Sequence, residues 1–424
     1  MSSLPGHIGW PVTGDKTIEF SKNPTQFVKG RITEYESRIF QTRILNKPHV
    51  FVASSQGVKE VLQDHSYAFT MGYKDFGYMY SLYGDLLLFN DSDEATRLKR
   101  ILCSVLQPHQ MAQCLAEVDT ICSRVLVNLH TEPVSLYKTF KTVTTQICLT
   151  LFLGLDFEEA QTEAGQIVDL TIQHWNGLIS LPVYFNVYGQ KSGYSKAMLA
   201  KNRLLEVINK QLLEVADLDG TIIGTLKEAG FVSRSELANH LLLFVSALVP
   251  KALASLLTSF CLELAKPRNN GMQERAAKDD LFLDDALLEV QRLWPPFLGG
   301  RRIARQDVVI DGYRIPSGYH VAYLTKASNT DPSIFPGPNH FDPKRWRTSN
   351  RDDCDRVWTF GAGPRKCVGH AFNNKIIKFV MRYLLRYYKW SLPEDQDLTY
   401  KWLPVSRPKH DVQVAFTKKT ADFL

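Results

Sequence analysis

Hydrophobic and polar residues alternate in two parts of the chain, and this period of two is typical of strands. Residues 38–44 read Arg-Ile-Phe-Gln-Thr-Arg-Ile and residues 49–52 read His-Val-Phe-Val, so we predict a small hairpin within 37–53. A further stretch, 308–321, predicts more strand. We interpret most of the remaining chain as helical. The pattern therefore predicts a mainly α fold with a smaller β-rich lobe.

Two helical stretches are distinguished by their prolines. Residues 281–293 form a helix-like run that must end at the Trp-Pro-Pro segment 294–296, because proline cannot continue a helix. Residues 236–266 form a long apolar helix that contains Pro250. A proline in a helix interior removes a hydrogen bond and costs about 3 kcal/mol or more, so we expect a kink there.

Composition and charge narrow the class of protein. The chain has 424 residues, of which 44% are hydrophobic and 22% are charged, so it can bury a large core. It has no internal repeat and only a modest polar break at 217–230, and we predict one continuous domain over 1–424. The net charge of +6 is modest, and Lys and Arg are spread along the chain, which argues against nucleic acid as a partner.

The cysteines and the start of the chain bear on location. Seven cysteines, without a Cys-x-x-Cys pair, argue against a disulfide framework and favour a reducing compartment. The chain begins with Met-Ser-Ser-Leu-Pro-Gly-His and shows neither a signal peptide nor an apolar run of the length that a membrane span needs. We therefore expect the chain to be soluble as given.

One cysteine lies in a glycine-rich loop between an aromatic residue and a long apolar helix, at 360–369 (Phe-Gly-Ala-Gly-Pro-Arg-Lys-Cys-Val-Gly). The segment looks like a haem-thiolate cradle, in which the Cys367 thiolate would ligate iron and push electron density toward it. Gly363 and Gly369 would let the backbone approach a porphyrin, and Arg365 would offer a cation to a propionate. The alternative is that Cys367 is an ordinary buried free cysteine.

The pattern Phe-x-x-Gly-x-Arg-x-Cys-x-Gly, which begins at Phe360, resembles the signature of the cytochrome P450 superfamily. The resemblance covers essentially the whole chain and implies a cytochrome P450 fold, with haem b buried between a long distal helix and the cysteine loop. It implies that Cys367 is the iron ligand, and that Phe360, Gly363, Arg365 and Gly369 bind the cofactor.

Two more segments resemble elements of the same superfamily. Glu289 and Arg292 resemble its Glu-x-x-Arg helix, and Arg345 lies in 341–346 (Phe-Asp-Pro-Lys-Arg-Trp), which resembles its meander. The resemblance implies that these three side chains form a buried structural cluster under the haem. A Glu and an Arg at this spacing are otherwise usually a solvated pair worth a few tenths of a kcal/mol.

Two further cations are candidates for haem propionates by resemblance. Arg302 follows the Glu-x-x-Arg helix as the family's propionate arginine does, and Lys99 lies where an early helix carries another. The family often has histidine or tryptophan one turn before the latter, where this chain has Ala95, and Asn373 replaces the alanine usual after the cysteine loop. A solvated basic helix face therefore stays open for Lys99.

Weaker similarities, at 9–11, 177–182 and 201–206, resemble a group that holds plant steroid and terpenoid enzymes, animal retinoic acid hydroxylases and a cyanobacterial relative. We therefore expect a small lipophilic substrate, terpenoid-like or fatty-acid-like. Eukaryotic relatives usually carry a membrane anchor before a Pro-Gly turn like that at 5–6, so localisation stays open between a naturally soluble enzyme and one associated with the endoplasmic reticulum whose anchor was removed.

By resemblance, the substrate pocket would be lined by 76–89, 247–253 and 297–298, with ordinary core packing as the alternative for each segment. The apolar stretch 178–187 would form a mouth in peripheral contact with a membrane, or else a loop facing the core.

The sharpest departure from the family lies in the distal helix. Monooxygenases of the family carry an acid followed by threonine there, because dioxygen activation needs two protons. This chain has no Asp or Glu between Glu236 and Glu263, so we predict that the proton relay is missing. Proline at this place also occurs in prostacyclin synthase and in fatty-acid peroxygenases, but the arginine that precedes it in the latter is Val249 here.

Pro250 and Lys251 are therefore the catalytic candidates on this helix. Pro250 would bend it at a distal groove, and Lys251 would anchor the substrate or handle protons if it faced the haem. The alternative for Lys251 is a side chain that extends to a polar edge.

Three functions follow. The first is a haem-thiolate oxidoreductase that rearranges or dehydrates an already oxidised lipophilic substrate, or uses a peroxide, and so needs no proton relay. The alternative is a monooxygenase that hydroxylates a terpenoid or steroid with electrons from an NADPH-dependent reductase. The second alternative is a haem-binding protein without turnover.

Overall fold

The computed structural model describes residues 3–75, 77–107, 111–158, 161–184, 186–187, 190–214, 221–246, 248–348 and 354–419. The chain divides into two compact units, each built from three separate stretches. We call the first the sheet unit: Met1–Gly72, Thr258–Cys367 and Glu394–Val412. The second, the helical unit, comprises Tyr73–Leu257, Val368–Pro393 and Gln413–Leu424. No single cut in the chain separates the two units, and the single domain over 1–424 stays a prediction.

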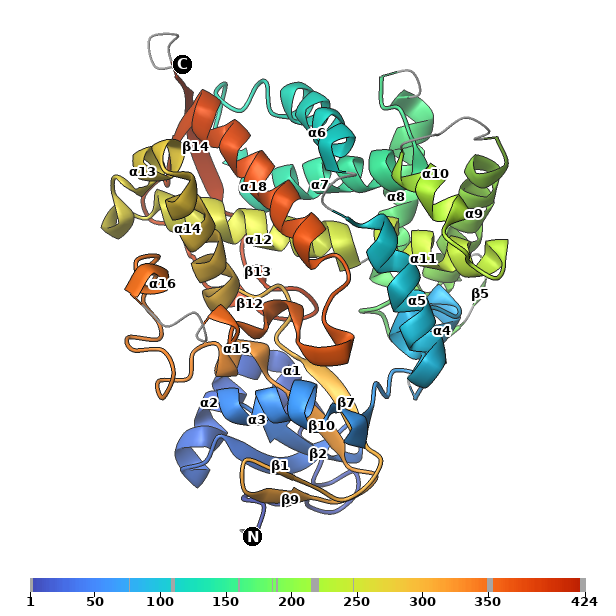
Figure 1. The fold of residues 1–424 in the computed structure, drawn as a ribbon, viewed down its shortest axis with the longest axis vertical. Coiled ribbons are helices and arrows are strands. Elements are labelled where there is room, and N and C mark those ends of the chain that lie inside the picture. The colour runs from blue at the N-terminus through green and yellow to red at the C-terminus, as the bar shows by residue number, and fades with distance from the viewer. Residues whose placement is uncertain are drawn as a thin grey trace. The chain divides into compact units, whose positions relative to one another are not determined.

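The sheet unit is built on a five-stranded sheet with the order β1-β2-β10-β7-β3 (Figure 1). Its strands are β1 (Ile39–Ile44), β2 (Lys47–Val52), β10 (His320–Tyr323), β7 (Gly300–Ala304) and β3 (Phe69–Thr70). β1 and β2 form the predicted antiparallel hairpin, β10 runs parallel to β2, and the other pairs are antiparallel. The second predicted strand region holds the hairpin of β8 (Val308–Ile310) and β9 (Tyr313–Ile315) and the start of β10.

The remaining elements of the sheet unit are mostly short. They are α1 (Thr17–Lys22), α2 (Pro24–Tyr35), α3 (Ser55–Lys59), η1 (Glu60–Asp64), η2 (Ser66–Ala68), η5 (Pro267–Asn269), α13 (Met272–Lys278), α14 (Asp280–Leu293), α15 (Thr325–Ser328), α16 (Arg345–Thr348), η6 (Trp358–Phe360), η7 (Gly363–Arg365), β12 (Tyr400–Lys401) and β13 (Arg407–Pro408).

Each face of the five-stranded sheet carries a buried cluster. Successive side chains of a strand point to opposite faces, so neighbouring residues of one strand join different clusters. On one face Phe40 and Phe51 stack with ring centroids 5.1 Å apart and join a cluster with α1 and α2. On the other face Val50 and Val321 pack with α3 and η1. In Figure 1 these helices lie beside the sheet.

The helical unit carries the longer helices. They are α4 (Gly77–Tyr83), η3 (Leu87–Phe89), α5 (Ser92–Val105), α6 (Met111–Val125), α7 (Leu136–Leu153), α8 (Gln161–Asn176), α9 (Gly193–Glu214), α10 (Ile222–Glu228), α11 (Arg234–Ser246), most of α12 (Leu248–Ala265) and α18 (His370–Tyr387). Its strands are β4 (Val134–Ser135), β5 (Asn186–Val187), β6 (Gln190–Lys191), β11 (Tyr388–Ser391) and β14 (Gln413–Lys418). These elements confirm the predicted mainly α fold with a smaller β-rich part.

The two predicted helices of interest are present. α14 begins at Asp280, where Asp279 caps it by accepting from the Phe282 N–H (3.0 Å), and ends before Trp294 as expected. The predicted helix 236–266 corresponds to α11 and α12, and Pro250 is in the first turn of α12. Because residue 247 lies outside the described residues, the kink at Pro250 stays a prediction.

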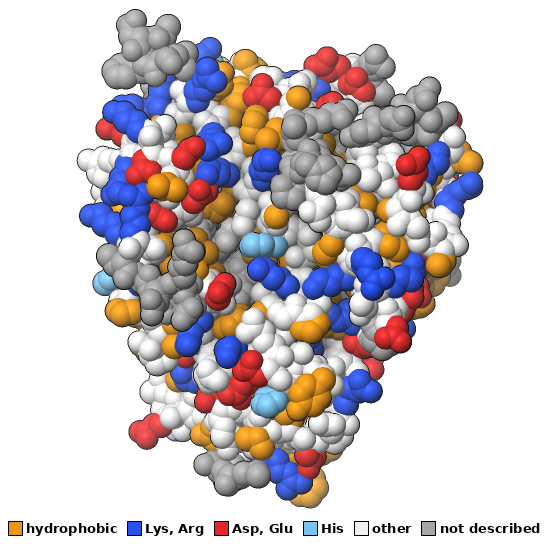
Figure 2. Space-filling model, viewed as in Figure 1, with side chains coloured by type: hydrophobic (Ala, Val, Ile, Leu, Met, Phe, Trp, Pro, Cys, Tyr) orange, Lys and Arg blue, Asp and Glu red, His pale blue; other side chains and the backbone are white. Residues whose placement is uncertain are grey.

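The expectation that no apolar run reaches the length of a membrane span is wrong. The helical stretch Arg234–Ala265, which runs over residue 247, is long and apolar enough by length and composition alone. Its apolar window is 76% buried inside the protein, as in the core helix of a globular fold. On the face drawn in Figure 2, basic and acidic side chains are interspersed, with apolar ones between them.

Candidate functional site

The cysteine loop runs from η6 through η7 to Cys367, and backbone hydrogen bonds within it fix its shape. The Cys367 N–H donates to the Phe360 carbonyl (2.9 Å), and the Lys366 N–H donates to the Gly363 carbonyl (3.1 Å). All seven cysteines are among the described residues, and only Cys367 has an exposed side chain. The alternative of a buried structural cysteine is therefore wrong, and the thiol is accessible to a ligand.

Gly363 cannot be another residue without moving the loop. Its φ is +62°, and a Cβ atom there would lie 2.1 Å from the Leu62 carbonyl oxygen in η1. Glycine is thus required by the close approach of two backbone segments of the sheet unit. At Gly369 the nearest atom to a Cβ would be the flexible Asn373 amide, at 3.3 Å, so space does not require glycine there. Contacts of either glycine with a porphyrin stay predictions.

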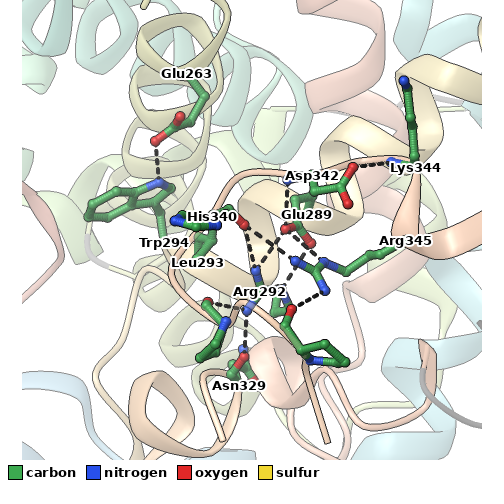
Figure 3. A network of polar contacts seen from close by, with 12 residues as sticks. Glu263, Glu289, Arg292, Leu293, Trp294, Asn329, His340, Asp342, Lys344 and Arg345 are labelled. Carbon is green, nitrogen blue, oxygen red and sulfur yellow. Dashed lines mark hydrogen bonds and ion pairs between the residues drawn. The ribbon is translucent and has the colours of Figure 1, made fainter. Parts of the chain in front are cut away.

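The three residues of the predicted structural cluster come together in the sheet unit (Figure 3). Glu289 accepts from Arg292 through Nη2 (2.7 Å) and Nε (2.9 Å), and from Arg345 Nε (3.0 Å). The Asp342 N–H also donates to Glu289 (3.1 Å). Glu289 and Arg292 are 0% exposed, so the alternative of a solvated pair is wrong.

Arg292 also fixes backbone segments around the cluster. Its guanidinium donates to the carbonyls of Asn329 (2.9 Å), Pro338 (2.7 Å) and His340 (3.1 Å). One buried arginine therefore orders the chain between α15 and α16 while its charge is balanced by Glu289.

A second buried carboxylate, Glu263, lies at the end of α12, where the sequence marks only the end of an acid-free stretch. It is 1% exposed, and it accepts from the Trp294 indole (2.8 Å), Arg268 (3.3 Å), Asn269 (3.3 Å) and the Lys266 ammonium. Figure 3 shows its link to Trp294, just beyond α14. An acid at the end of an otherwise apolar helix was the available signal, but nothing in the sequence identifies its partners.

The candidate propionate cations lie in both units. In the sheet unit, Arg302 is buried on β7, donates to the Arg301 carbonyl (2.7 Å) and has its guanidinium carbon 5.2 Å from the centre of the Tyr323 ring. Arg365 is half-buried in η7. Lys99 is half-buried on α5 in the helical unit, and its place at a haem propionate stays a prediction.

The catalytic candidates on α12 are both buried. Thr144 of α7 donates to the Pro250 carbonyl (2.8 Å). Lys251 is 3% exposed and its Nζ atom is buried, so the alternative of a side chain reaching a polar edge is wrong. Its charge acts on the Cys148 thiol of α7, whose pKa burial raises and Lys251 partly lowers. The Pro250 carbonyl is therefore bound to α7, and Lys251 lies within electrostatic range of α7; the catalytic roles of both residues stay predictions.

A buried histidine that contacts the end of α11 was missed because no motif surrounds it. His174 of α8 lies with Nε2 3.0 Å from the Leu82 carbonyl and Nδ1 2.7 Å from the Ser246 hydroxyl at the end of α11. Burial lowers the pKa of His174 to about 4, so it is neutral at neutral pH. Because a carbonyl only accepts, Nε2 carries the proton, and the unprotonated Nδ1 faces the Ser246 hydroxyl, which donates to the Leu242 carbonyl (2.6 Å).

The structure describes the predicted pocket segments except for the first residue of two of them. Phe76 and Ala247 lie outside the described residues, as do 217–220 of the predicted break. Leu298 is buried in the apolar cluster of α1 and α2, whereas Phe297 is half-buried.

The donor groups of the sheet unit fit haem b. An exposed thiol at Cys367 suits the iron, and the cations of Arg302 and Arg365 suit the two propionates. Haem held by a thiolate supplies an electron-rich iron that favours cleavage of O–O bonds.

Comparison with known proteins agrees with this fit. The family model described as Cytochrome P450 matches residues 265–416. Cytochrome P450 120 of Synechocystis sp. is 26% identical over 440 residues, covering 97% of this chain and 96% of that protein. Beta-amyrin 28-monooxygenase of Kalopanax septemlobus is 22% identical over 430 residues, covering 92% and 88%.

Among solved structures, retinoic-acid-bound cyanobacterial CYP120A1 is 25% identical with a TM-score of 0.85, covering 98% of this chain and 99% of that one. The predicted cytochrome P450 fold is therefore confirmed. Residues 265–416 therefore match the cytochrome P450 family, and nearly the whole chain is similar to haem-thiolate enzymes of that family, whose cofactor is haem b.

Proposed function

We propose that this enzyme acts on a small lipophilic substrate by a reaction that does not require protonation of dioxygen: rearrangement or dehydration of an oxidised lipid, or oxidation by a peroxide. The proposal rests on one observation, the lack of an available acid along α11 and α12. Within these helices the sequence has no Asp or Glu between Glu236 and Glu263.

The two flanking acids are engaged away from the middle of the stretch. Glu236 binds Arg97 of α5 and accepts from the Val232 N–H (2.9 Å). Glu263 is held by Trp294 and Arg268. Neither carboxylate is placed to pass protons to the centre of the helix, where a conventional monooxygenase needs them.

The hydroxyl closest to Pro250 along α11 is also committed. Ser246 lies within 2.7 Å of His174 Nδ1 and 2.6 Å of the Leu242 carbonyl, and His174 is neutral at neutral pH. A neutral histidine that already donates to the Leu82 carbonyl holds no spare proton for this hydroxyl. The described residues thus favour chemistry in which the substrate or oxidant is already a peroxide, so that dioxygen need not be reduced and protonated.

The alternative is a reductase-dependent monooxygenase that takes its protons from substrate hydroxyls or ordered water. It is favoured by the similarity of this chain to beta-amyrin 28-monooxygenase. The similarity to CYP120A1, whose solved structure is bound to retinoic acid, favours a lipophilic substrate in either case. An NADPH-dependent reductase would be a partner only in this alternative. A haem-binding protein without turnover is the third candidate.

The test is to incubate the purified ferric protein with a panel of lipid hydroperoxides, anaerobically and without reductase or NADPH, and to follow products by mass spectrometry. A Cys367→Ser variant is the control for free haem chemistry. Isomers or dehydration products formed only by the wild type would support the proposal, and oxygen transfer to a second molecule would indicate the peroxide-using form.

Two outcomes would overturn the proposal. Turnover that starts only when a reductase, NADPH, dioxygen and a terpenoid are supplied would assign the enzyme to the monooxygenases. No turnover with any oxidant, in a protein that holds haem, would favour the third candidate.

A further inference from the structure

Asn329 joins the buried cluster of Glu289, Arg292 and Arg345 to the cysteine loop. It follows α15 and is fully buried. Its backbone carbonyl accepts from Arg292 (2.9 Å), as Figure 3 shows. The same residue therefore belongs to the cluster through its main chain and leaves its side chain for other partners.

The side chain of Asn329 holds the first two residues of η6. Its Oδ1 accepts from the Trp358 N–H (2.9 Å), and its Nδ2 donates to the Thr359 hydroxyl (3.2 Å). Thr359 in turn donates to the Gln291 carbonyl in α14 (2.6 Å). The Trp358 N–H needs an acceptor, and the Thr359 oxygen needs a donor because the Thr359 proton goes to Gln291. A side-chain amide carries both an acceptor and a donor, so it matches the site.

The third residue of η6 is Phe360, whose carbonyl accepts from the Cys367 N–H. A short path of hydrogen bonds therefore runs from Arg292 through Asn329 and η6 to the backbone of Cys367. Every residue of this path lies in the sheet unit, and Arg292, Asn329 and Trp358 are buried. Buried hydrogen bonds are strong constraints on position, because breaking one leaves a group that water cannot reach.

We propose that Asn329 is a positioning residue that fixes Cys367 relative to the haem iron, and so sets the strength of the thiolate bond to iron. This inference rests on the assignment of Cys367 as the haem ligand. It goes beyond a structural role for the cluster, because it predicts a change in the electronic properties of the haem and not only in stability.

The test compares Asn329→Ala with Asn269→Ala. Asn269 is also buried in the sheet unit, and its amide donates to the Glu263 carbonyl (2.7 Å) and carboxylate (3.3 Å), not to the cysteine loop. Both variants are expected to lower the thermal midpoint. A milder second variant, Thr359→Val, keeps the side-chain shape and removes only the hydroxyl that Asn329 binds.

Three properties are measured on the haem-loaded proteins: the rate of haem transfer to apomyoglobin, the reduction potential, and the absorption band of the ferrous carbon monoxide complex. We expect Asn329→Ala to transfer haem about 10 to 100 times faster than wild type, as for outer partners of metal ligands. Its potential should rise, and part of its carbon monoxide band should move to the shorter wavelength of thiol ligation. Thr359→Val should shift in the same direction by less, and Asn269→Ala should match wild type in all three.

A wild-type potential and carbon monoxide band in Asn329→Ala and Thr359→Val, together with lowered thermal midpoints, would overturn the inference and leave Asn329 a purely structural residue. The same shifts in Asn269→Ala would also overturn it. A wild-type protein without the thiolate band would instead overturn the assignment of Cys367, and the inference with it.

Discussion

The replacement Glu289→Gln tests how much the buried cluster stabilises the protein. Gln keeps the shape of the side chain but removes the charge that balances Arg292 and Arg345, at a site where Glu289 and Arg292 are 0% exposed. Removing one partner of a buried ion pair costs about 3–5 kcal/mol, because the remaining charge stays buried without compensation. Glu289 serves two arginines and the Asp342 N–H, so we expect a loss near the upper end of that range.

A matched control exists on the surface of α9. Arg203 and Glu206 are also three residues apart and 3.0 Å from each other, but their side chains are 71% and 64% exposed. Glu206→Gln should therefore cost at most about 0.5 kcal/mol. The assay is guanidinium unfolding of the haem-loaded proteins followed by tryptophan fluorescence, with the free energy of unfolding compared at equal slopes.

The two variants separate the cluster from ordinary helix pairs. Domains are usually stable by about 5–15 kcal/mol, so a loss of this size removes a large part of the total and should also reduce haem content. A loss of less than about 1 kcal/mol for Glu289→Gln, similar to that of Glu206→Gln, would refute the reasoning, because it would mean that the arginines reach other counter-charges or water.

Three further predictions concern the space around a glycine of the cysteine loop and two buried basic side chains. Gly363→Ala should reduce haem retention and lower the thermal midpoint more than Gly361→Ala, because both have positive φ but only Gly363 would place a Cβ against the Leu62 carbonyl. Burial lowers the pKa of Lys326 from 10.5 to about 7. Between these pH values the unfolded chain binds more protons than the folded protein, so the stability of the wild type should rise with pH. In Lys326→Met, thermal midpoints measured across this range should rise less. Burial lowers the pKa of His174 from 6.5 to about 4, so stability should fall as pH drops through this window, and less steeply in His174→Gln; equal slopes in wild type and variant would contradict this.

The sequence predicted the local elements and the members of the cluster, because both leave short-range patterns. Alternation identified β1 and β2, and the spacing of Glu289 and Arg292, with Arg345 further on, identified three side chains that the structure brings together. In each case the signal lies within a few residues, or in a motif that resembles a known family.

The sequence could not predict contacts whose partners are far apart in the chain and carry no motif. Glycine at 363 was expected to approach a porphyrin, but the atom that requires it here is the Leu62 carbonyl, about three hundred residues earlier in the chain. Lys251 was expected either at the haem or at a polar edge; its burial excludes the polar edge, and a place at the haem stays a prediction. Such side chains are placed by the packing of helices, which periodicity does not specify.

The same distinction separates haem binding from turnover. Gly363 on Leu62, Asn329 on Trp358 and Thr359 on Gln291 all hold the cysteine loop, and all lie in the sheet unit. The motifs that assign the family are therefore motifs for presenting a thiolate, and they would be kept by an enzyme of any reaction type and by a protein with none. Under the proposed function, the reaction would depend instead on groups around Ser246 and Pro250 in the helical unit, where this chain lacks the acid and threonine of the monooxygenases it resembles. Substitutions in the sheet unit should accordingly change haem content and potential, whereas substitutions around α11 and the start of α12 should change the product while leaving the haem spectrum intact.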